Sequence, residues 1–441
     1  MADQVKDFIT AKAEQIPVVA QTDVIVVGAG PAGLSAAVSA ARNGCSVTLI
    51  ERYHHLGGMA SGGMVLVLDD MVNEGNEIVT TGIVTEFVER MEQQGGAVYP
   101  PKEDCLKNWD MWQKWSRWGC INFHEPGMPQ SILHAVAFDP DAWKRVSLDL
   151  VKDCNINLRL HSWFSEAIVE GGKVQGVICQ TKLGRQALMA DMVIDATGDL
   201  DLAASAGADF IQGEYIVTTV FRLCDVDTAK AEAFEYANPE EYKKLDRQAR
   251  RIIGGAWGMW WLKTPLPGIV WCNCPHMTGY DGMSPEDMAG AEFEGRERMM
   301  NLLAFARANL PGFENAKMLG AAEQLGIRQT RLLRGEYVVA TKTFQNVGRV
   351  PGTFKLTAGL GWGRLGSAGA IGSPFGGNRP SFVGGSTGGN LSVDQWFRGP
   401  AAPFGGIEWQ INEKFGVKAE YSSDAYTQEV GTAGIFTRKS R

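Results

Sequence analysis

The chain has 441 residues, enough for two or three domains with substantial cores. Its formal net charge is −8 and it contains no basic cluster, which argues against a nucleic-acid partner. No apolar stretch is long and glycine-poor enough to span a bilayer as a helix. The eight cysteines are scattered without a framework, which favours free thiols in a reducing compartment.

The first segment, residues 1–22, is predicted to be an N-terminal arm. It mixes acidic residues and lysines with short apolar runs, and it shows no cationic start followed by an apolar middle and a small-residue cleavage site. We therefore expect no secretory signal and a cytoplasmic protein.

Residues 23–51 read as strand, tight turn, helix and strand. The apolar run 23–27 leads into Gly28-Ala29-Gly30-Pro31-Ala32-Gly33, and an alanine-rich helix then extends to residue 43. Gly28 permits the tight turn, Gly30 leaves room for a pyrophosphate against the backbone, and Gly33 lets the helix pack closely on the strand. The unpaired N–H groups at the start of the helix favour phosphate.

Glu51 stands at the end of the second strand, which covers residues 45–50. A carboxylate there can accept hydrogen bonds from both hydroxyls of an adenosine ribose. A lone Gly-x-Gly-x-x-Gly pattern is weak evidence, but here the strand before it, the helix and strand after it and the terminal acid all fit. The pattern therefore predicts a dinucleotide site.

A second glycine pair, Gly57-Gly58, follows within residues 52–64 and would let the chain pass back under a bound pyrophosphate. With the first motif, it resembles the FAD-binding domain of the glutathione-reductase-type flavoproteins, which implies FAD rather than NAD. Disulfide reductases of that superfamily carry a redox-active cysteine pair after these glycines. Ala60 stands at that place here, so we do not expect a dithiol mechanism.

Four tryptophans, at positions 109, 112, 115 and 118, follow a predicted amphipathic helix within residues 79–96. Steps of three drift by about 60° per step around an α-helix, so the four rings cannot share one face. The favoured interpretation is a short, heavily packed insertion. The alternative is an aromatic lid over a substrate such as a sugar.

Residues 138–210 read as a helix capped by Asp139, several short strands, and a strand that ends in Ala196-Thr197-Gly198-Asp199. The last motif resembles the second FAD element of the same superfamily, where a strand re-enters the sheet beside the cofactor. The residues that we predict to bind FAD are Gly28, Ala29, Gly30, Pro31, Ala32, Gly33, Glu51, Arg52, Gly57, Gly58, Met59, Phe164, Ala196, Thr197, Gly198 and Asp199.

Residues 76–137 and 211–350 are predicted to form a second domain that holds a small-molecule substrate. Arg328 and Arg331 could clamp an anionic substrate, or they could be paired with acids at a domain seam. His276, with His124 and His134, is a candidate proton donor or a structural histidine. Cys272, Cys274 and His276 have poor spacing for a metal, so we predict no metal site.

From residue 1 to about 349 the chain resembles the bacterial FAD-dependent oxidoreductase family, whose substrates are mostly undefined. The resemblance implies a flavin redox enzyme without naming its reaction. The matching runs are 26–33, 56–63, 138–141, 194–207, 311–316 and 326–337.

After residue 350 the chain becomes glycine-rich and its apolar residues alternate, as in 356–362, 407–411 and 415–421, with a hairpin predicted between the last two runs. The runs 359–365, 396–400 and 418–424 resemble the bacterial outer-membrane β-barrel family associated with exopolysaccharide and capsule export. About 90 residues supply too few strands to close a barrel.

The C-terminal element that closes over the isoalloxazine in the first family is not found after residue 350. We therefore interpret the chain as a chimera joined near Val350. The predicted fold class is α/β: a Rossmann-like FAD-binding domain (23–75 and 138–210) of glutathione-reductase type with an inserted α+β second domain, plus an unrelated β-rich segment (351–441).

The first functional interpretation is an oxidoreductase that passes a hydride between flavin N5 and a small organic substrate. The alternatives are a nucleotide-binding remnant without turnover and a structural fragment of an outer-membrane barrel.

Overall fold

A computed structural model of the chain describes residues 9, 13–69, 71–72, 76–78, 80–123, 125, 127–208, 210–212, 216–255, 259–327, 331–333, 335–345, 351–363, 371–374, 401–411 and 415–421. It divides into two compact units. Unit one contains residues 1–208 and 212–332, and unit two contains residues 209–211 and 333–441. Among the described residues, no helix is both long and apolar enough to cross a membrane.

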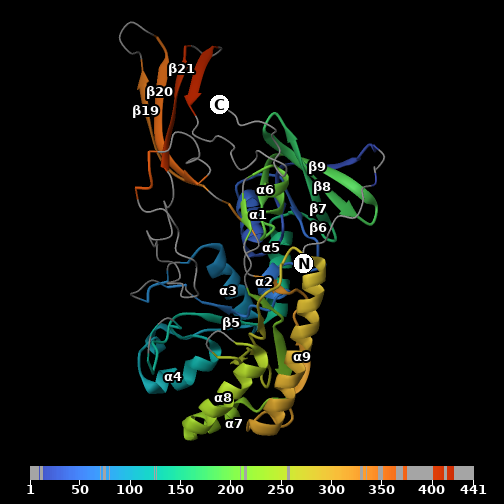
Figure 1. The fold of residues 1–441 in the computed structure, drawn as a ribbon, viewed down its shortest axis with the longest axis vertical. Helices are drawn as coiled ribbons and strands as arrows, with labels where there is room; N and C mark the ends of the chain where they lie inside the picture. The colour runs from blue at the N-terminus through green and yellow to red at the C-terminus, as the bar shows by residue number, and fades with distance from the viewer. Residues whose placement is uncertain are drawn as a thin grey trace. The chain divides into compact units, whose positions relative to one another are not determined.

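A six-stranded sheet in the order β6-β2-β1-β9-β8-β7 organises the first half of unit one (Figure 1). The first four strands in that order are parallel, and the last two are added as antiparallel hairpins. Ile25 and Val26 point to opposite faces of β1 and both are fully buried, as expected of a strand covered on two sides. The strands are β1 (Val18–Val27), β2 (Val47–Ile50), β6 (Asn157–Arg159), β7 (Trp163–Glu170), β8 (Lys173–Thr181) and β9 (Gly184–Asp195).

Strand β1 begins at Val18, before the predicted boundary at residue 23, so residues 18–22 of the expected arm belong to the sheet. Ala20 pairs with Leu188 and Thr22 with Ala190 in the parallel ladder between β1 and β9. Val18 is 61% exposed, so this part of the strand shows no buried apolar run. Its position depends on pairing with β9, which a local pattern does not reveal.

The helices of the first half begin where the sequence provides a start signal. Helix α1 (Pro31–Arg42) has proline in its first turn, and α5 (Pro140–Asp153) begins after Asp139, whose Oδ2 accepts a 2.9 Å hydrogen bond from the N–H of Ala142. Helix α3 (Ile83–Gln93) lies within the predicted range. The remaining elements here are α2 (Gly58–Ser61), β3 (Val67–Leu68), β4 (Ala97–Val98), η1 (Lys102–Asp104), β5 (Val136–Phe138) and α6 (Asp201–Ser205).

The tryptophan-rich segment forms helix α4 (Trp109–Trp115) and the 3₁₀ turn η2 (Ser116–Trp118). Trp112 and Trp115 are buried in the same apolar core as helices α1, α3 and α5, whereas Trp109 is 52% exposed. None of the four lines the pocket described below. The structure therefore favours the packed insertion over an aromatic lid.

The second half of unit one packs three helices around a four-stranded sheet in the order β13-β14-β12-β16, and helix α8 lies against α9 (Figure 1). This half of unit one also contains a separate three-stranded sheet in the order β15-β11-β17. The elements are β11 (Val217–Thr218), β12 (Phe221–Cys224), α7 (Thr228–Ala237), α8 (Pro239–Ile253), β13 (Leu262–Lys263), β14 (Val270–Cys272), β15 (His276–Met277), α9 (Pro285–Asn309), β16 (Lys317–Ala321) and β17 (Gly326–Ile327). The short strands β10 (Phe210–Gln212) and β18 (Arg331–Leu333) lie at the two unit boundaries.

Unit two contains an antiparallel sheet of sequential strands, β19 (Gly335–Gln345), β20 (Thr353–Gly363), β21 (Ala401–Gln410) and β22 (Gly416–Tyr421). Strands β21 and β22 pair antiparallel as the alternation predicts, and the residues between them, 412–414, lie outside the described part of the chain. All eleven residues of β19 pair with β20. By its contacts, the compact C-terminal unit begins near residue 333, whereas the sequence predicts the β-rich segment from residue 351.

Candidate functional site

The turn between β1 and α1 brings backbone groups into very close contact. Gly28 has a φ of +98°, and a Cβ there would lie 2.3 Å from the carbonyl oxygen of Ala196. A Cβ at Gly33 would lie 1.8 Å from the carbonyl oxygen of Gly28. Only glycine fits these two positions, so the helix start is held against the ends of β1 and β9.

The carboxylate of Glu51 is fixed at the edge of this turn. It is 6% exposed, and its Oε2 accepts a 2.9 Å hydrogen bond from the N–H of Ala29. Its Oε1 accepts another of 2.9 Å from the N–H of Tyr53. Each carboxylate oxygen keeps a second lone pair, so Glu51 can still accept hydrogen bonds from a ligand beside the glycine turn.

The second glycine pair lies directly against the first turn. The N–H of Gly57 donates a 2.8 Å hydrogen bond to the carbonyl of Ala29, and Gly57 has a φ of +108°. A Cβ on Gly58 would lie 3.0 Å from the Cα of Gly30. The two glycine turns therefore leave backbone, without side chains, on one wall of the site.

The end of β9 supplies a third backbone turn. The N–H of Ala196 donates a 2.9 Å hydrogen bond to Val27, which continues the ladder past the strand. Asp195 Oδ1 accepts hydrogen bonds from the N–H of Thr197 at 3.0 Å and from its hydroxyl at 2.7 Å. Gly198 has a φ of +90°. These contacts hold the turn 196–199 next to the first glycine turn.

These turns surround a pocket of about 1040 Å³, at the upper end of the usual size of ligand sites. The predicted residues that line it are Gly28, Gly30, Pro31, Ala32, Glu51, Arg52, Gly58, Met59, Phe164, Ala196, Thr197, Gly198 and Asp199. Three predicted residues lie behind this lining. Ala29 is fully buried and its N–H holds Glu51. Gly33 packs against the backbone of Gly28, and Gly57 packs against Trp143.

One wall of the pocket was not predicted. It comprises residues 322–325 and Ile327, with Met288, Glu292 and Arg296 from helix α9. The N–H of Gln324 donates a 3.1 Å hydrogen bond to the carbonyl of Gly62, which places this segment against the second glycine turn. No periodic pattern or motif marks the segment, because long-range contacts determine its position.

The candidate catalytic residues are not brought to this pocket by the described part of the structure. His276 lies in β15 and does not line the pocket, and burial lowers its pKa to about 4. His134 does not line it either, and burial lowers its pKa. Arg328 and His124 lie outside the described residues, and the side chain of Arg331 is not described.

Cys272 and Cys274 are fully buried in an apolar core, and burial raises the pKa of both thiols. Within the described residues, no group of three or more histidine, cysteine or carboxylate side chains could hold a metal ion. The segment 272–276 therefore contributes packing to the second half of unit one.

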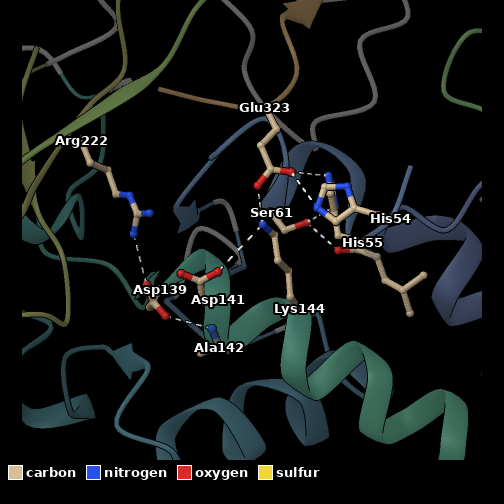
Figure 2. Close-up of polar contacts among 10 residues, drawn as sticks. His54, His55, Ser61, Asp139, Asp141, Ala142, Lys144, Arg222 and Glu323 are labelled. Carbon is tan, nitrogen blue, oxygen red and sulfur yellow. Dashed lines mark hydrogen bonds and ion pairs between the residues drawn. The ribbon is translucent and has the colours of Figure 1, made fainter. Parts of the chain in front are cut away.

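A polar network reaches the pocket wall through Glu323 (Figure 2). Its Oε1 lies 2.8 Å from Nζ of Lys144 on helix α5, and its Oε2 lies 3.0 Å from Nε2 of His55. Nδ1 of His55 lies 3.4 Å from Oγ of Ser61. The His55 side chain is 4% exposed and that of Glu323 is 40% exposed, so the network connects a buried ring to the pocket.

The charges of this network follow from its surroundings. Burial lowers the pKa of His55, although the neighbouring carboxylate acts in the opposite direction. Burial alone would raise the pKa of Glu323, but Lys144 and the histidines outweigh it and the pKa lies below its usual value. At neutral pH we therefore expect an ionised Glu323 beside a neutral His55.

Comparison with known protein families gives two matches. The family described as FAD dependent oxidoreductase matches residues 23–351, and the family described as exopolysaccharide biosynthesis protein YbjH matches residues 323–441. No curated protein matches the chain.

Solved structures to which the chain is similar include a geranylgeranyl bacteriochlorophyll reductase-like protein from Thermoplasma acidophilum. It is 18% identical with a TM-score of 0.40, and the match covers 70% of this chain and 66% of that one. L-amino acid deaminase from Proteus vulgaris is 12% identical with a TM-score of 0.44, covering 71% of this chain and 85% of that one. Glycine oxidase from Geobacillus kaustophilus is 13% identical with a TM-score of 0.39, covering 71% and 84%.

Proposed function

Because the chain belongs to the FAD dependent oxidoreductase family, we propose that it binds FAD in the pocket of unit one. The bound flavin and a small organic substrate would exchange a hydride there. The observation that carries the proposal is the convergence of three glycine-containing turns and the carboxylate of Glu51 on one pocket. When bound, FAD supplies the hydride chemistry, and the protein supplies binding, orientation and electrostatics.

The described residues fit the cofactor. Glu51 retains hydrogen-bonding capacity for the ribose hydroxyls, and the turn at Gly30 and Gly58 presents bare backbone for the pyrophosphate. Gly30 caps helix α1 without a side-chain hydrogen bond, which leaves the first N–H groups of the helix for phosphate oxygens. Met59 and residues 322–325 line the same pocket and would hold the rest of the cofactor.

From the sequence we expect no closing element for the isoalloxazine after residue 350, and residues 322–325 are candidates to take its place. The N–H of Ala322 donates a 2.7 Å hydrogen bond to Val220, and that of Gln324 donates one to Gly62. Residues 322–325 are therefore held between the second half of unit one and the second glycine turn. We propose that this segment closes the flavin end of the pocket in place of the missing element.

We further propose a glutathione-reductase type of FAD-binding domain, formed by residues 23–75 and 138–210, with a second domain formed by residues 76–137 and 211–350. The parallel order β6-β2-β1-β9 with its added antiparallel strands supports this assignment. Arg328 and Arg331 remain candidates to orient an anionic substrate.

For unit two we propose a separate origin, in a protein of polysaccharide export at the outer membrane. The two matched families overlap only at residues 323–351, and the boundary between the compact units lies inside that overlap, near residue 333. A junction-spanning peptide identified by mass spectrometry, together with one long genomic read, would show a natural fusion. Two separate reading frames would contradict it.

The test of the main proposal is the visible absorption spectrum of the purified chain, with flavin quantified against protein. We expect about one flavin per chain. A colourless protein that gains no flavin after addition of FAD would contradict FAD binding. A yellow protein whose flavin no organic reductant bleaches would favour the alternative of a remnant without turnover.

A further inference from the structure

We propose that Arg296 on helix α9 is an anion-binding residue of the pocket, and that its guanidinium receives a phosphate or carboxylate group. The anion is either the pyrophosphate of the cofactor or an acidic group of the substrate, which present the same chemistry to an arginine. The inference rests on the proposed function and adds a residue from the wall of the pocket that was not predicted.

Helix α9 presents one line of side chains to the pocket. Met288, Glu292 and Arg296 follow one another at intervals of four residues, and all three line it. Four residues advance about 40° around an α-helix and about 6 Å along it, so the three side chains share a face. Arg298 lies about 160° away from Arg296 around the helix and does not line the pocket.

The lining of the pocket carries an excess of negative charge. Among the described residues that line it, the carboxylates are those of Glu51, Asp199, Asp201, Glu292 and Glu323, and the guanidinium groups are those of Arg52 and Arg296. A pyrophosphate or an acidic substrate that enters adds further negative charge. Its binding therefore requires a cation that can approach it.

Arg52 is already engaged by aromatic rings. Its Cζ lies 4.9 Å from the ring centre of Tyr53 and 5.3 Å from that of Trp163, and both rings belong to residues that line the pocket. Because Arg52 directly follows Glu51, it lies at the end of the pocket that is predicted to hold the ribose. Of the two arginines, Arg296 is therefore the one available to an anion elsewhere in the pocket.

The ion pair of Arg296 leaves one edge of its guanidinium uncovered. Nε donates a 2.7 Å hydrogen bond to Oε1 of Glu292, and Nη2 lies 2.5 Å from the same oxygen. Nη1 makes no hydrogen bond to the described part of the chain, and the side chain is 53% exposed. The edge formed by Nη1 and Nη2 therefore retains N–H groups in the forked arrangement that binds two oxygens of a phosphate or carboxylate.

The first arm of the experiment uses the FAD-free chain and measures the dissociation constants of ADP and adenosine by calorimetry. If the anion is the pyrophosphate, Arg296→Gln should weaken ADP binding about tenfold and leave adenosine binding unchanged. Arg298→Gln is the matched control, because Arg298 pairs with Glu294 on the same helix but lies outside the pocket lining. The control should bind both ligands as the wild type does.

The second arm uses the FAD-loaded chain and titrates it with benzoate and with its neutral analogue benzamide, followed by the visible spectrum of the flavin. If the anion belongs to the substrate, Arg296→Gln should weaken benzoate binding about tenfold, with ADP and benzamide unaffected. Equal dissociation constants for Arg296→Gln and the wild type with both ADP and benzoate would overturn the proposal.

A third variant, Glu292→Gln, separates the charge of Arg296 from a structural role. It removes the carboxylate that neutralises the guanidinium, so it should tighten binding of the responding anion several-fold, in the direction opposite to Arg296→Gln. A loss of affinity in both variants would show that the pair acts through the stability of helix α9, and it would overturn the anion-binding role.

The flavin content of the wild type, measured first, distinguishes this inference from the proposed function. A chain that takes up FAD while Arg296→Gln binds both anions as the wild type does contradicts the role of Arg296 alone. A wild type that binds neither FAD nor ADP contradicts the proposed function and this inference together.

Discussion

The N–H of Ala29 donates a 2.9 Å hydrogen bond to Oε2 of Glu51, a residue at the end of the neighbouring strand. The bond joins the glycine turn to the residue that is predicted to hold the ribose. The carboxylate is therefore fixed in place before any ligand binds, and little side-chain freedom is lost on binding.

Glu51→Gln should weaken FAD binding by about tenfold to a hundredfold, because hydrogen bonds from hydroxyls to a carboxylate are stronger than those to an amide. The dissociation constant is measured by quenching of flavin fluorescence in a titration of the FAD-free protein. Glu166→Gln, at an exposed position on β7, is the matched control and should bind as the wild type does. Equal affinities for the two variants would contradict a ribose-binding role for Glu51.

Gly33→Ala should destabilise unit one by at least about 2 kcal/mol, because the new Cβ would lie 1.8 Å from the carbonyl oxygen of Gly28. Urea unfolding followed by tryptophan fluorescence measures the loss. Gly320→Ala is the control, since a Cβ there meets no atom within 4 Å. A Gly33→Ala variant as stable as Gly320→Ala would show that the turn can relax.

The segment from the end of β1 to Glu51 could be predicted because each residue type there has a local physical cause. Gly28 takes a positive φ, and Gly33 tolerates the contact with the turn only without a side chain. Such requirements are visible in a single sequence. The same holds for the cap of helix α5 by Asp139.

The opposite wall of the pocket could not be predicted for a physical reason. Gln324 reaches the pocket through a backbone hydrogen bond to Gly62, more than 250 residues earlier in the chain, and its own neighbours show no periodicity. Likewise, strand β19 is defined by its pairing with β20. Residues 335–337 at its start also belong to the run 326–337 that resembles the oxidoreductase family, so the sequence predicts a later start for the C-terminal segment.

Arg117→Met should destabilise unit one by about 3–5 kcal/mol, because it removes the ion pair of Glu235, whose side chain is only 12% exposed. Arg117 is 1% exposed, and its guanidinium donates hydrogen bonds to Glu235 at 2.6 Å, to the Tyr242 hydroxyl at 2.6 Å and to the Trp261 carbonyl at 3.0 Å. Chemical denaturation measures the change.

The control for Arg117 is an exposed pair in the same unit, Lys230 with Glu314. Lys230→Met should change the free energy of unfolding by less than about 1 kcal/mol, since solvent screens such pairs. A double variant, Arg117→Met with Glu235→Gln, should recover part of the loss. No recovery would show that the cost comes from packing rather than from the unpaired carboxylate.

Burial keeps His276 neutral by lowering its pKa to about 4. In the unfolded chain a histidine titrates near pH 6.5. Between these values the unfolded state binds a proton that the folded state does not. The free energy of unfolding is therefore retained above about pH 6.5 and falls as the pH is lowered towards 4.

His276→Gln should reduce the difference in the free energy of unfolding between pH 8 and pH 5 by about 2 kcal/mol, measured by urea unfolding at both values. The other histidines are present in both proteins and cancel in the comparison. His161→Gln, at an exposed position, controls for the loss of an imidazole. A pH dependence that His276→Gln leaves unchanged would mean that the ring reaches solvent in the folded protein.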